Sequence, residues 1–207
     1  LILVLIVFVA FFIALFFSGC AHTVDLKQNI WKVETDEGSC TGFQVNGGFL
    51  VTAAHCVLDK NHVVFKKDEV VVIAELRRLD PESDVAVFFS DSLSASNGFN
   101  VACYLPSFGD DIFALGYPGA LGNTLISQKI SLIDQDPEHL FLVRSLDGKV
   151  WQGMSGGPLV DQYGNVFGVI HGFQLVNHSN QILAPAIMKI DLYSTGTQNE
   201  LFCKNLQ

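Results

Sequence analysis

Short apolar runs separated by turn-forming residues fill most of the chain. Phe, Val and Ile dominate these runs, and such residues are enriched in β-strands. Clusters of Gly, Asn and Asp interrupt the runs, for example at residues 46–48 and 163–165. Residues 191–204 are the one candidate for a helical period. The pattern predicts strands at residues 43–45, 49–53, 62–65, 70–76, 85–89, 112–115, 124–133, 140–145, 158–160, 166–171 and 182–187. We therefore expect an all-β domain of about ten or more short strands, built as a barrel or a sandwich pair.

The first seventeen residues are consecutively apolar and carry no charge. A run of this length is slightly shorter than the roughly 20 residues that span a bilayer, and small residues follow it, as in an export signal. The residues FSGC at 17–20 resemble the bacterial lipobox, with Phe in place of the usual Leu. We expect residues 1–19 to be a signal and Cys20 to be lipidated. An uncleaved membrane anchor and an ordinary cleaved signal are the alternatives, and all three place the rest of the chain outside the cytoplasm.

Composition and charge narrow the function classes. The 207 residues are 49% hydrophobic, which is enough for a real core. Acidic residues outnumber basic ones, 21 to 12, and the only basic doublets are at 66–67 and 77–78. Because a phosphate backbone requires a basic face, we expect no nucleic-acid partner. Without internal repeats, the chain is expected to form a stalk at residues 20–28 and one domain at residues 29–207.

Five cysteines fit an exported protein. If Cys20 carries lipid, an even number remains in a compartment where disulfides persist: Cys40, Cys56, Cys103 and Cys203. A hairpin that turns at residues 46–48 pairs positions whose numbers sum to about 95, which places Cys40 opposite Cys56. A Cys40–Cys56 disulfide is predicted, with two buried free thiols as the alternative. The pairing of Cys103 with Cys203 stays open, and no CxxC or HExxH spacing suggests a metal site.

Three short segments carry residues suited to catalysis. His55 follows an apolar strand and small residues, so its imidazole would be held rigidly and remain accessible as a general base. Asp84 heads an apolar strand, and such a half-buried carboxylate needs a donor, which the His55 Nδ1–H group would supply. Ser155 lies among glycines that permit a tight turn, in which the N–H groups of Gly153 and Ser155 converge on one point and would stabilise an oxyanion.

Each segment alone has a plainer interpretation: a structural histidine, a turn aspartate after Asp80 and Pro81, or a glycine-rich loop. Their combination is more specific. The order His55, Asp84, Ser155, with TAAHC at residues 52–56 and GMSGGP at residues 153–158, resembles the trypsin-like (chymotrypsin-fold) serine peptidases over residues 38–173. FALGYPG at residues 113–119 and the short spacing between His55 and Asp84 resemble compact bacterial HtrA-like or glutamyl-endopeptidase-like branches, here without room for a PDZ domain.

The resemblance implies two six-stranded antiparallel β-barrels with the active site between them. It also implies endopeptidase activity on a polypeptide substrate by acyl transfer, with no cofactor. His55 would take the proton of Ser155, and the N–H groups of Gly153 and Ser155 would hold the oxyanion. The substrate would lie as an added strand along Val169, Ile170, His171 and Gly172.

Three positions depart from better-known family patterns. Met154 stands where trypsin-type zymogens have an activating aspartate, and Lys149 supplies no acidic pocket floor. His171 invites comparison with glutamate-specific relatives. Counted from Ser155, however, it falls one place late on its strand, which directs the side chain to the other face.

Two other protein classes compete with the peptidase interpretation. The GMSGG segment also matches the elbow of α/β-hydrolases, but that elbow opens a helix, and too little chain follows Ser155 for that architecture. The chain could also be a catalytically silent binding domain on the peptidase fold. No member of the expected triad is missing, which favours an active enzyme.

Overall fold

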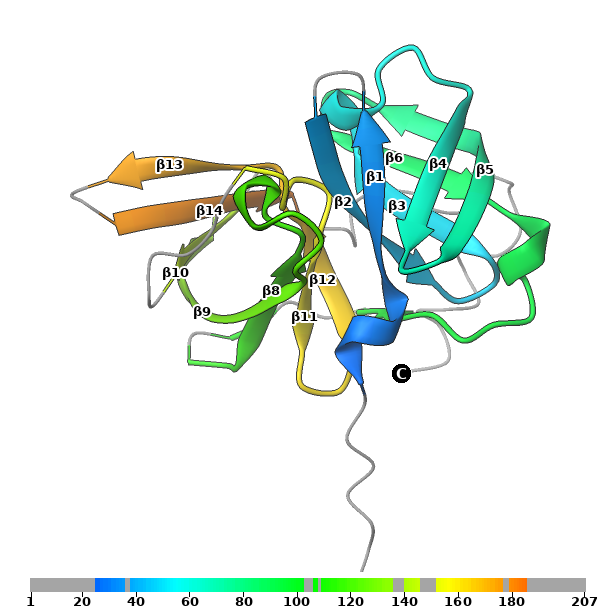
Figure 1. Cartoon of the computed structure of the whole chain (residues 1–207). Coiled ribbons are helices and arrows are strands. Elements are labelled where there is room, and N and C mark those ends of the chain that lie inside the picture. The colour runs from blue at the N-terminus through cyan, green and yellow to red at the C-terminus, as the bar shows by residue number, and fades with distance from the viewer. Residues whose placement is uncertain are drawn as a thin grey trace, which may run out of the picture.

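Strands make up nearly all of the regular structure and form two halves that lie side by side (Figure 1). The structure, a computed structural model, describes residues 25–35, 38–102, 106–107, 109–135, 140–145, 152–176 and 179–185. Among them are four 3-10 helices: η1 (Leu26–Asn29), η2 (Ala54–Cys56), η3 (Asp91–Leu93) and η4 (Gly119–Leu121). None of the described helices combines the length and the apolar character that a bilayer crossing requires.

Several predicted features lie outside the described residues. These are the signal at residues 1–19, Cys20, Cys103, Lys149, the candidate helix at residues 191–204, and Cys203. Of the expected stalk at residues 20–28, the described part includes most of η1, and Leu26 packs against the core.

The first half is a closed antiparallel barrel of six strands. These are β1 (Ile30–Thr35), β2 (Gly38–Val45), β3 (Phe49–Ala53), β4 (His62–Lys67), β5 (Val70–Asp80) and β6 (Val85–Phe89), in the order β1-β2-β3-β6-β5-β4. Val33 pairs with Phe65 where β1 meets β4 and closes the barrel, and both side chains are fully buried. The apolar runs do not predict β1, because Lys32 and Glu34 interrupt its hydrophobic residues. The six-stranded first barrel is confirmed.

The second half is an eight-stranded sheet in the described residues, where the sequence predicts a second barrel of six. Its strands are β7 (Asn100–Val101), β8 (Ile112–Gly116), β9 (Ile126–Gln135), β10 (Leu140–Ser145), β11 (Pro158–Asp161), β12 (Asn165–Val169), β13 (Gly172–Val176) and β14 (Ser179–Pro185). Their order is β13-β14-β10-β9-β8-β11-β12-β7, and only β12 and β7 pair in parallel. The predicted strand at 166–171 ends at Val169 in the structure, and Ile170 hydrogen-bonds to Gly156 and Gly157, which directly precede β11. The all-β fold class is confirmed.

One hydrophobic cluster joins the two halves. Phe43 and Val87 come from the first barrel, and Leu115 and Val160 come from the second sheet. Phe99, on the connection between the halves, packs in the same cluster, and its N–H group donates to the Gln44 carbonyl at 2.9 Å. The halves are therefore held against each other by a shared core, which fixes the position of any site between them.

The predicted disulfide between Cys40 and Cys56 is present. The two residues are not partners in the strand ladder, because the β2–β3 register pairs Phe43 with Val51 and Gly42 with Thr52. Cys56 lies beyond β3, in the single turn of η2, which brings its sulfur back to β2. The disulfide therefore ties the η2 turn to β2.

Replacing both cysteines by serine should lower the free energy of unfolding by about 3 kcal/mol, because a loop of this length loses its covalent restraint in the unfolded chain. Urea unfolding followed by tryptophan fluorescence measures the change. Reductant should destabilise the native protein by a similar amount more than it destabilises the double variant. Equal stability of native and double-variant proteins would contradict the prediction.

Candidate active site

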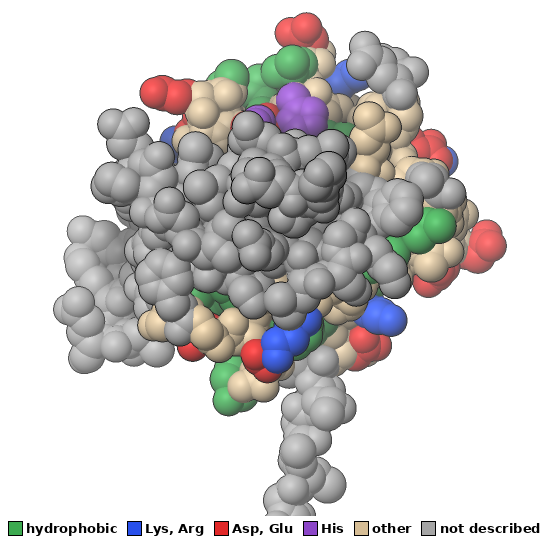
Figure 2. Space-filling view, turned by 90° about the vertical axis from the view of Figure 1, so that its left-hand side faces the viewer, with side chains coloured by type: hydrophobic (Ala, Val, Ile, Leu, Met, Phe, Trp, Pro, Cys, Tyr) green, Lys and Arg blue, Asp and Glu red, His purple; other side chains and the backbone are tan. Residues whose placement is uncertain are grey.

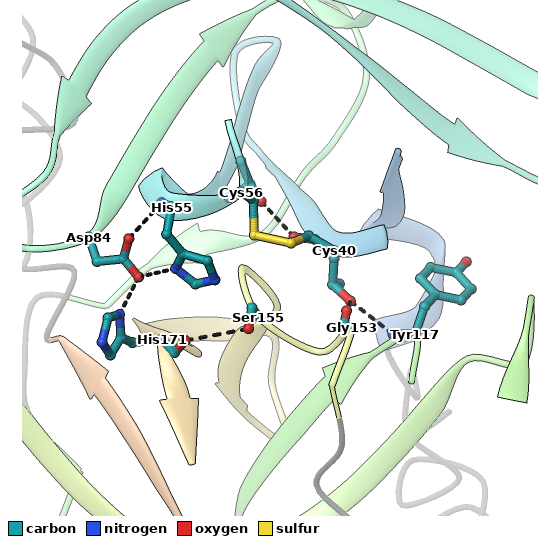
Figure 3. The surroundings of a disulfide bond; sticks show 10 residues. Cys40, His55, Cys56, Asp84, Tyr117, Gly153, Ser155 and His171 are labelled. Carbon is teal, nitrogen blue, oxygen red and sulfur yellow. Dashed lines mark hydrogen bonds and ion pairs between the residues drawn. A yellow bond between two sulfur atoms is a disulfide. The ribbon is translucent and has the colours of Figure 1, made fainter. Parts of the chain in front are cut away.

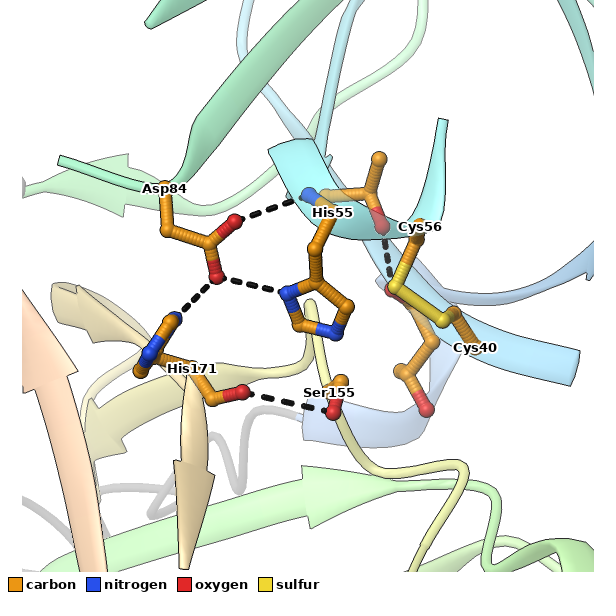
Figure 4. Close-up of polar contacts among 8 residues, drawn as sticks. Cys40, His55, Cys56, Asp84, Ser155 and His171 are labelled. Carbon is orange, nitrogen blue, oxygen red and sulfur yellow. Dashed lines mark hydrogen bonds and ion pairs between the residues drawn. A yellow bond between two sulfur atoms is a disulfide. The ribbon is translucent and has the colours of Figure 1, made fainter. Parts of the chain in front are cut away.

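His55 and Asp84 meet at one end of the first barrel because their strands are neighbours. Ala53 at the end of β3 pairs with Val85 at the start of β6, so the residues just beyond them lie together. The His55 backbone N–H group donates to Asp84 Oδ1 at 2.8 Å, and His55 Nδ1 lies 2.7 Å from Asp84 Oδ2 (Figure 4). Two hydrogen bonds thus fix the carboxylate relative to the imidazole.

Asp84 is held in an unusual environment for a carboxylate. Its side chain is nearly buried, and its backbone has φ = 53°, in the left-handed region that non-glycine residues rarely occupy. Burial raises the pKa of the Asp84 carboxyl, but the hydrogen bonds from His55 and His171 outweigh this effect and leave the pKa below its ordinary value. The hydrogen bond with Asp84 raises the pKa of His55, and partial burial opposes it. Asp84 is therefore an anion that favours a proton on His55 Nδ1.

The segment that carries Ser155 contacts both halves, through Thr41 of the first barrel and Ile170 of the second half. Gly156 has φ = +83°, and a side chain there would come within 2.2 Å of the Thr41 carbonyl oxygen, so only glycine fits. The Gly156 N–H group donates to the Ile170 carbonyl, and the Ile170 N–H group donates to the Gly157 carbonyl, both at 2.7 Å. These bonds fasten the segment to the end of β12.

Thr41 of β2 holds the same segment from the first barrel. Its buried hydroxyl donates to the Gly153 carbonyl at 2.8 Å and accepts from the Tyr117 N–H group at 2.9 Å. Figure 3 shows Gly153 and Tyr117 close together near the Cys40–Cys56 disulfide. The Thr41 N–H group donates to the Ser155 carbonyl at 2.8 Å. One residue of the first barrel thus fixes the main chain on both sides of Met154.

The Ser155 hydroxyl lies on the side of the His55 ring that is away from Asp84 (Figure 4). It donates to the His171 carbonyl oxygen at 3.4 Å, and in the described part of the chain no hydrogen bond joins it to His55. Hydrogen bonds between catalytic groups are often long or absent without substrate. The structure therefore brings the three predicted catalytic side chains to one place, with the imidazole between the carboxylate and the hydroxyl.

The main-chain N–H groups of Gly153 and Ser155 are the groups predicted to stabilise an oxyanion. The Gln152 carbonyl accepts from the Gly119 N–H group at 2.7 Å, and a trans peptide directs the following N–H group the opposite way, so that the Gly153 N–H group points away from Gly119. Within the described residues, neither the Gly153 nor the Ser155 N–H group donates to a protein acceptor. Gly153 and His55 line a cleft of about 850 Å³.

His171 contacts all three of the predicted catalytic residues. Its Nδ1 atom hydrogen-bonds to Asp84 Oδ2, the oxygen that His55 Nδ1 also contacts. The His171 and His55 rings lie edge to face, with their centroids 5.7 Å apart. The His171 carbonyl oxygen accepts a hydrogen bond from the Ser155 hydroxyl. Sequence reasoning placed His171 among substrate-binding residues and missed its contact with Asp84. The one-residue offset directed the side chain to the other face but did not identify Asp84 as its partner.

The other residues predicted to bind substrate differ in accessibility. Val169 lies in β12 and is buried, and Ile170 is buried with both main-chain groups bonded to the Ser155 segment. The His171 side chain is half-exposed, and Gly172, which opens β13, is partly exposed. The end of the predicted stretch, rather than its start, thus reaches the surface beside Ser155.

Comparison with known proteins identifies the family. The model of the trypsin-like peptidase domain matches residues 40–169. Because this match covers more than half of the chain, the protein belongs to the trypsin-like peptidase family. The all-β, chymotrypsin-like fold agrees with this assignment.

Two curated relatives carry names of serine proteases. Serine protease MT3772 of Mycobacterium tuberculosis is 33% identical over 141 residues, which cover 64% of this chain and 35% of the relative. Serine protease HTRA1B of Danio rerio is 30% identical over 159 residues, which cover 72% of this chain and 33% of the relative. The chain thus spans about a third of the length of these relatives.

Solved structures share the fold. The active form of the Rv3671c protease from M. tuberculosis superposes with a TM-score of 0.66 at 24% identity, over 78% of this chain and 77% of that one. The serine endoprotease from Yersinia pestis superposes with a TM-score of 0.64 at 18% identity, over 78% of this chain and 61% of that one. These likenesses support the chymotrypsin-like arrangement of the two halves.

The Thr41→Val variant should lower the free energy of unfolding by about 3 kcal/mol, because it leaves the buried Tyr117 N–H group and Gly153 carbonyl without partners. Urea unfolding measures the loss. Thr124→Val, at an exposed position, is the matched control and should be neutral. A Thr41→Val protein as stable as Thr124→Val would show that the hydroxyl does not hold the Ser155 segment.

Proposed function

We propose that the protein is a serine endopeptidase that hydrolyses peptide bonds through an acyl-enzyme, with His55, Asp84 and Ser155 as its catalytic triad. The observation that carries the proposal is the His55 ring, bonded to a buried carboxylate on one side and facing Ser155 on the other. This geometry leaves a lone pair on His55 Nε2, which is the group that a serine nucleophile requires.

The reaction follows from these positions. The Ser155 hydroxyl rotates from the His171 carbonyl to His55 Nε2, which takes its proton as the oxygen attacks the substrate carbonyl. Asp84 stabilises the imidazolium that forms, and His55 then gives the proton to the leaving amine. Water, activated by the same imidazole, hydrolyses the acyl-enzyme and restores Ser155.

The N–H groups of Gly153 and Ser155, which donate to no acceptor among the described residues, would bind the oxygen on which negative charge develops. Thr41 and Gly119 fix the peptides around these groups before substrate arrives, which is what electrostatic catalysis requires. An oxyanion hole whose N–H groups are already oriented does not have to rearrange its main chain during the reaction.

The substrate would be a polypeptide that adds as a strand beside His171 and Gly172 and continues into the cleft beside His55 and Gly153. His171 Nδ1 is engaged with Asp84, so the ring is oriented by the catalytic acid of the proposed triad and not by a substrate pocket. We therefore propose no preference for glutamate.

We propose that the enzyme acts outside the cytoplasm. The Cys40–Cys56 disulfide supports an oxidising compartment. A relative from Brucella suis, 31% identical over 142 residues that cover 59% of this chain and 26% of the relative, is named a probable periplasmic serine endoprotease. Lipidation at Cys20, and attachment to the cell membrane through residues 1–19 or that lipid, stay predictions.

Ser155→Ala and His55→Ala should each lower kcat by about 10⁴-fold or more, because the triad acts as a unit. Hydrolysis of a fluorogenic casein and labelling of Ser155 by a fluorophosphonate measure the loss. Ser94→Ala, at an exposed site beside η3, is the matched control. A folded native protein that neither cleaves nor is labelled would favour the silent binding domain instead.

The acid limb of kcat/KM against pH should lie above the ordinary histidine pKa of 6.5, because Asp84 raises the pKa of His55 and only neutral His55 can accept the proton. Activity is therefore lost as pH falls through this raised pKa. In Asp84→Asn the limb should move to lower pH while the maximal rate falls by about 10⁴-fold. A native limb at or below that of the variant would refute this dependence.

A further inference from the structure

We propose that His55, Asp84 and His171 form a binding site for a zinc-class divalent cation, and that the bound cation inhibits the enzyme. The inhibition rests on the proposed peptidase function, whereas the binding does not. One ligand atom from each residue lies within 4.8 Å of the other two. The nearby group Cys40, His55 and Cys56 offers no such site, because its two sulfurs are bonded to each other.

The donor set selects the cation. Two imidazole nitrogens and one carboxylate oxygen are ligands that Zn²⁺ accepts, often with water in a fourth position. Mg²⁺ and Ca²⁺ prefer sets made of oxygen alone. The Asp84 carboxylate would offset part of the added charge, and its ion pairs in the described residues are with these two histidines.

Asp84 is already oriented as a metal ligand. The His55 backbone N–H group holds Oδ1, while Oδ2 faces the Nδ1 atoms of both imidazoles. A hydrogen bond on one carboxylate oxygen with the other free to coordinate is the usual arrangement of an oriented monodentate ligand. A cation would take the place of the two protons that now lie between the imidazoles and Oδ2.

The two imidazoles must move away from Asp84 Oδ2 to admit a cation. His55 Nδ1 and Asp84 Oδ2 are 2.7 Å apart, whereas tetrahedral zinc with bonds of about 2.0 Å separates its donor atoms by about 3.3 Å. The His55 and His171 side chains are 43% and 45% exposed, so both rings can move outward. The space-filling view shows histidine side chains at the surface of the face that it presents (Figure 2).

Coordination through Nδ1 would disable the general base without contacting Ser155. In the resting enzyme, His55 carries its proton on Nδ1 and a lone pair on Nε2. When the cation occupies the Nδ1 lone pair, the neutral imidazole must carry its proton on Nε2. That nitrogen then cannot accept the Ser155 proton, so the cation traps the wrong tautomer.

Binding is tested on the full chain carrying Ser155→Ala, so that no activity is needed. Calorimetry with Zn²⁺ and visible absorption with Co²⁺ should show an ion whose binding depends on His171 and which Mg²⁺ does not displace. Adding His171→Asn should raise Kd for Zn²⁺ by about 10- to 100-fold or more, because it removes a ligand. His62→Asn, at an exposed position on β4, is the matched control and should leave Kd unchanged.

The His171→Asn protein is first shown to be folded by its thermal unfolding. Equal Zn²⁺ affinity with and without His171, or no binding, would overturn the site. Nitrogen NMR of the imidazoles should show coordination at Nδ1 and a proton on Nε2 of His55, and the reverse pattern would also overturn the mechanism.

Activity separates the two proposals. Zn²⁺ should inhibit peptide hydrolysis by the native protein, and a chelator should restore it. If Ser155→Ala binds Zn²⁺ through His171 but the folded native protein cleaves no peptide, the proposed function fails and the metal site stands. If the native protein cleaves peptides and His171→Asn is inhibited equally by Zn²⁺, the metal site fails and the peptidase stands.

Discussion

The hydrogen bonds of Thr41 are the contact on which the rest of the site depends. The nucleophile segment belongs to the second half of the molecule, whereas His55 and Asp84 belong to the first barrel. A shared hydrophobic core holds the halves together but is non-directional. Directional bonds from Thr41 to Gly153 and Ser155 convert that contact into a fixed geometry. The disulfide at Cys40, the neighbouring residue, ties the His55 turn to the same strand.

Much of the fold and site could be predicted from the sequence, because the informative features are local. The apolar runs at β3 and β6 predict strands, and Asp84 and His55 at their ends follow as a pair once those strands are adjacent. The second half was less predictable. β7 has only two residues, which is too short for a hydrophobic pattern to reveal. Its parallel pairing with β12 joins segments that are about 65 residues apart, and no local pattern encodes such a contact.

His171 shows where sequence reasoning stops. Its offset from Ser155 predicts a face different from that of the glutamate-specific relatives. In the structure His171 lies between β12 and β13, and its partner depends on how the two halves are packed. The structure places Asp84 there, so that a residue of the second half bonds the carboxylate of the first. Through its carbonyl the same residue also engages Ser155. His171 therefore links Asp84 to Ser155 independently of His55.

His55 and His171 both contact Asp84 Oδ2, and this arrangement can either support or inhibit the proposed reaction. As hydrogen-bond donors, they keep Asp84 ionised in spite of its burial and keep the proton of His55 on Nδ1, the tautomer that catalysis needs. As ligands, the same three groups would favour a cation at that position and the opposite tautomer. A peptidase with only one histidine at its acid offers a cation too few ligands. Under the two proposals, the second histidine stabilises the ionised form of Asp84 and, by the same geometry, would make the enzyme sensitive to metal ions.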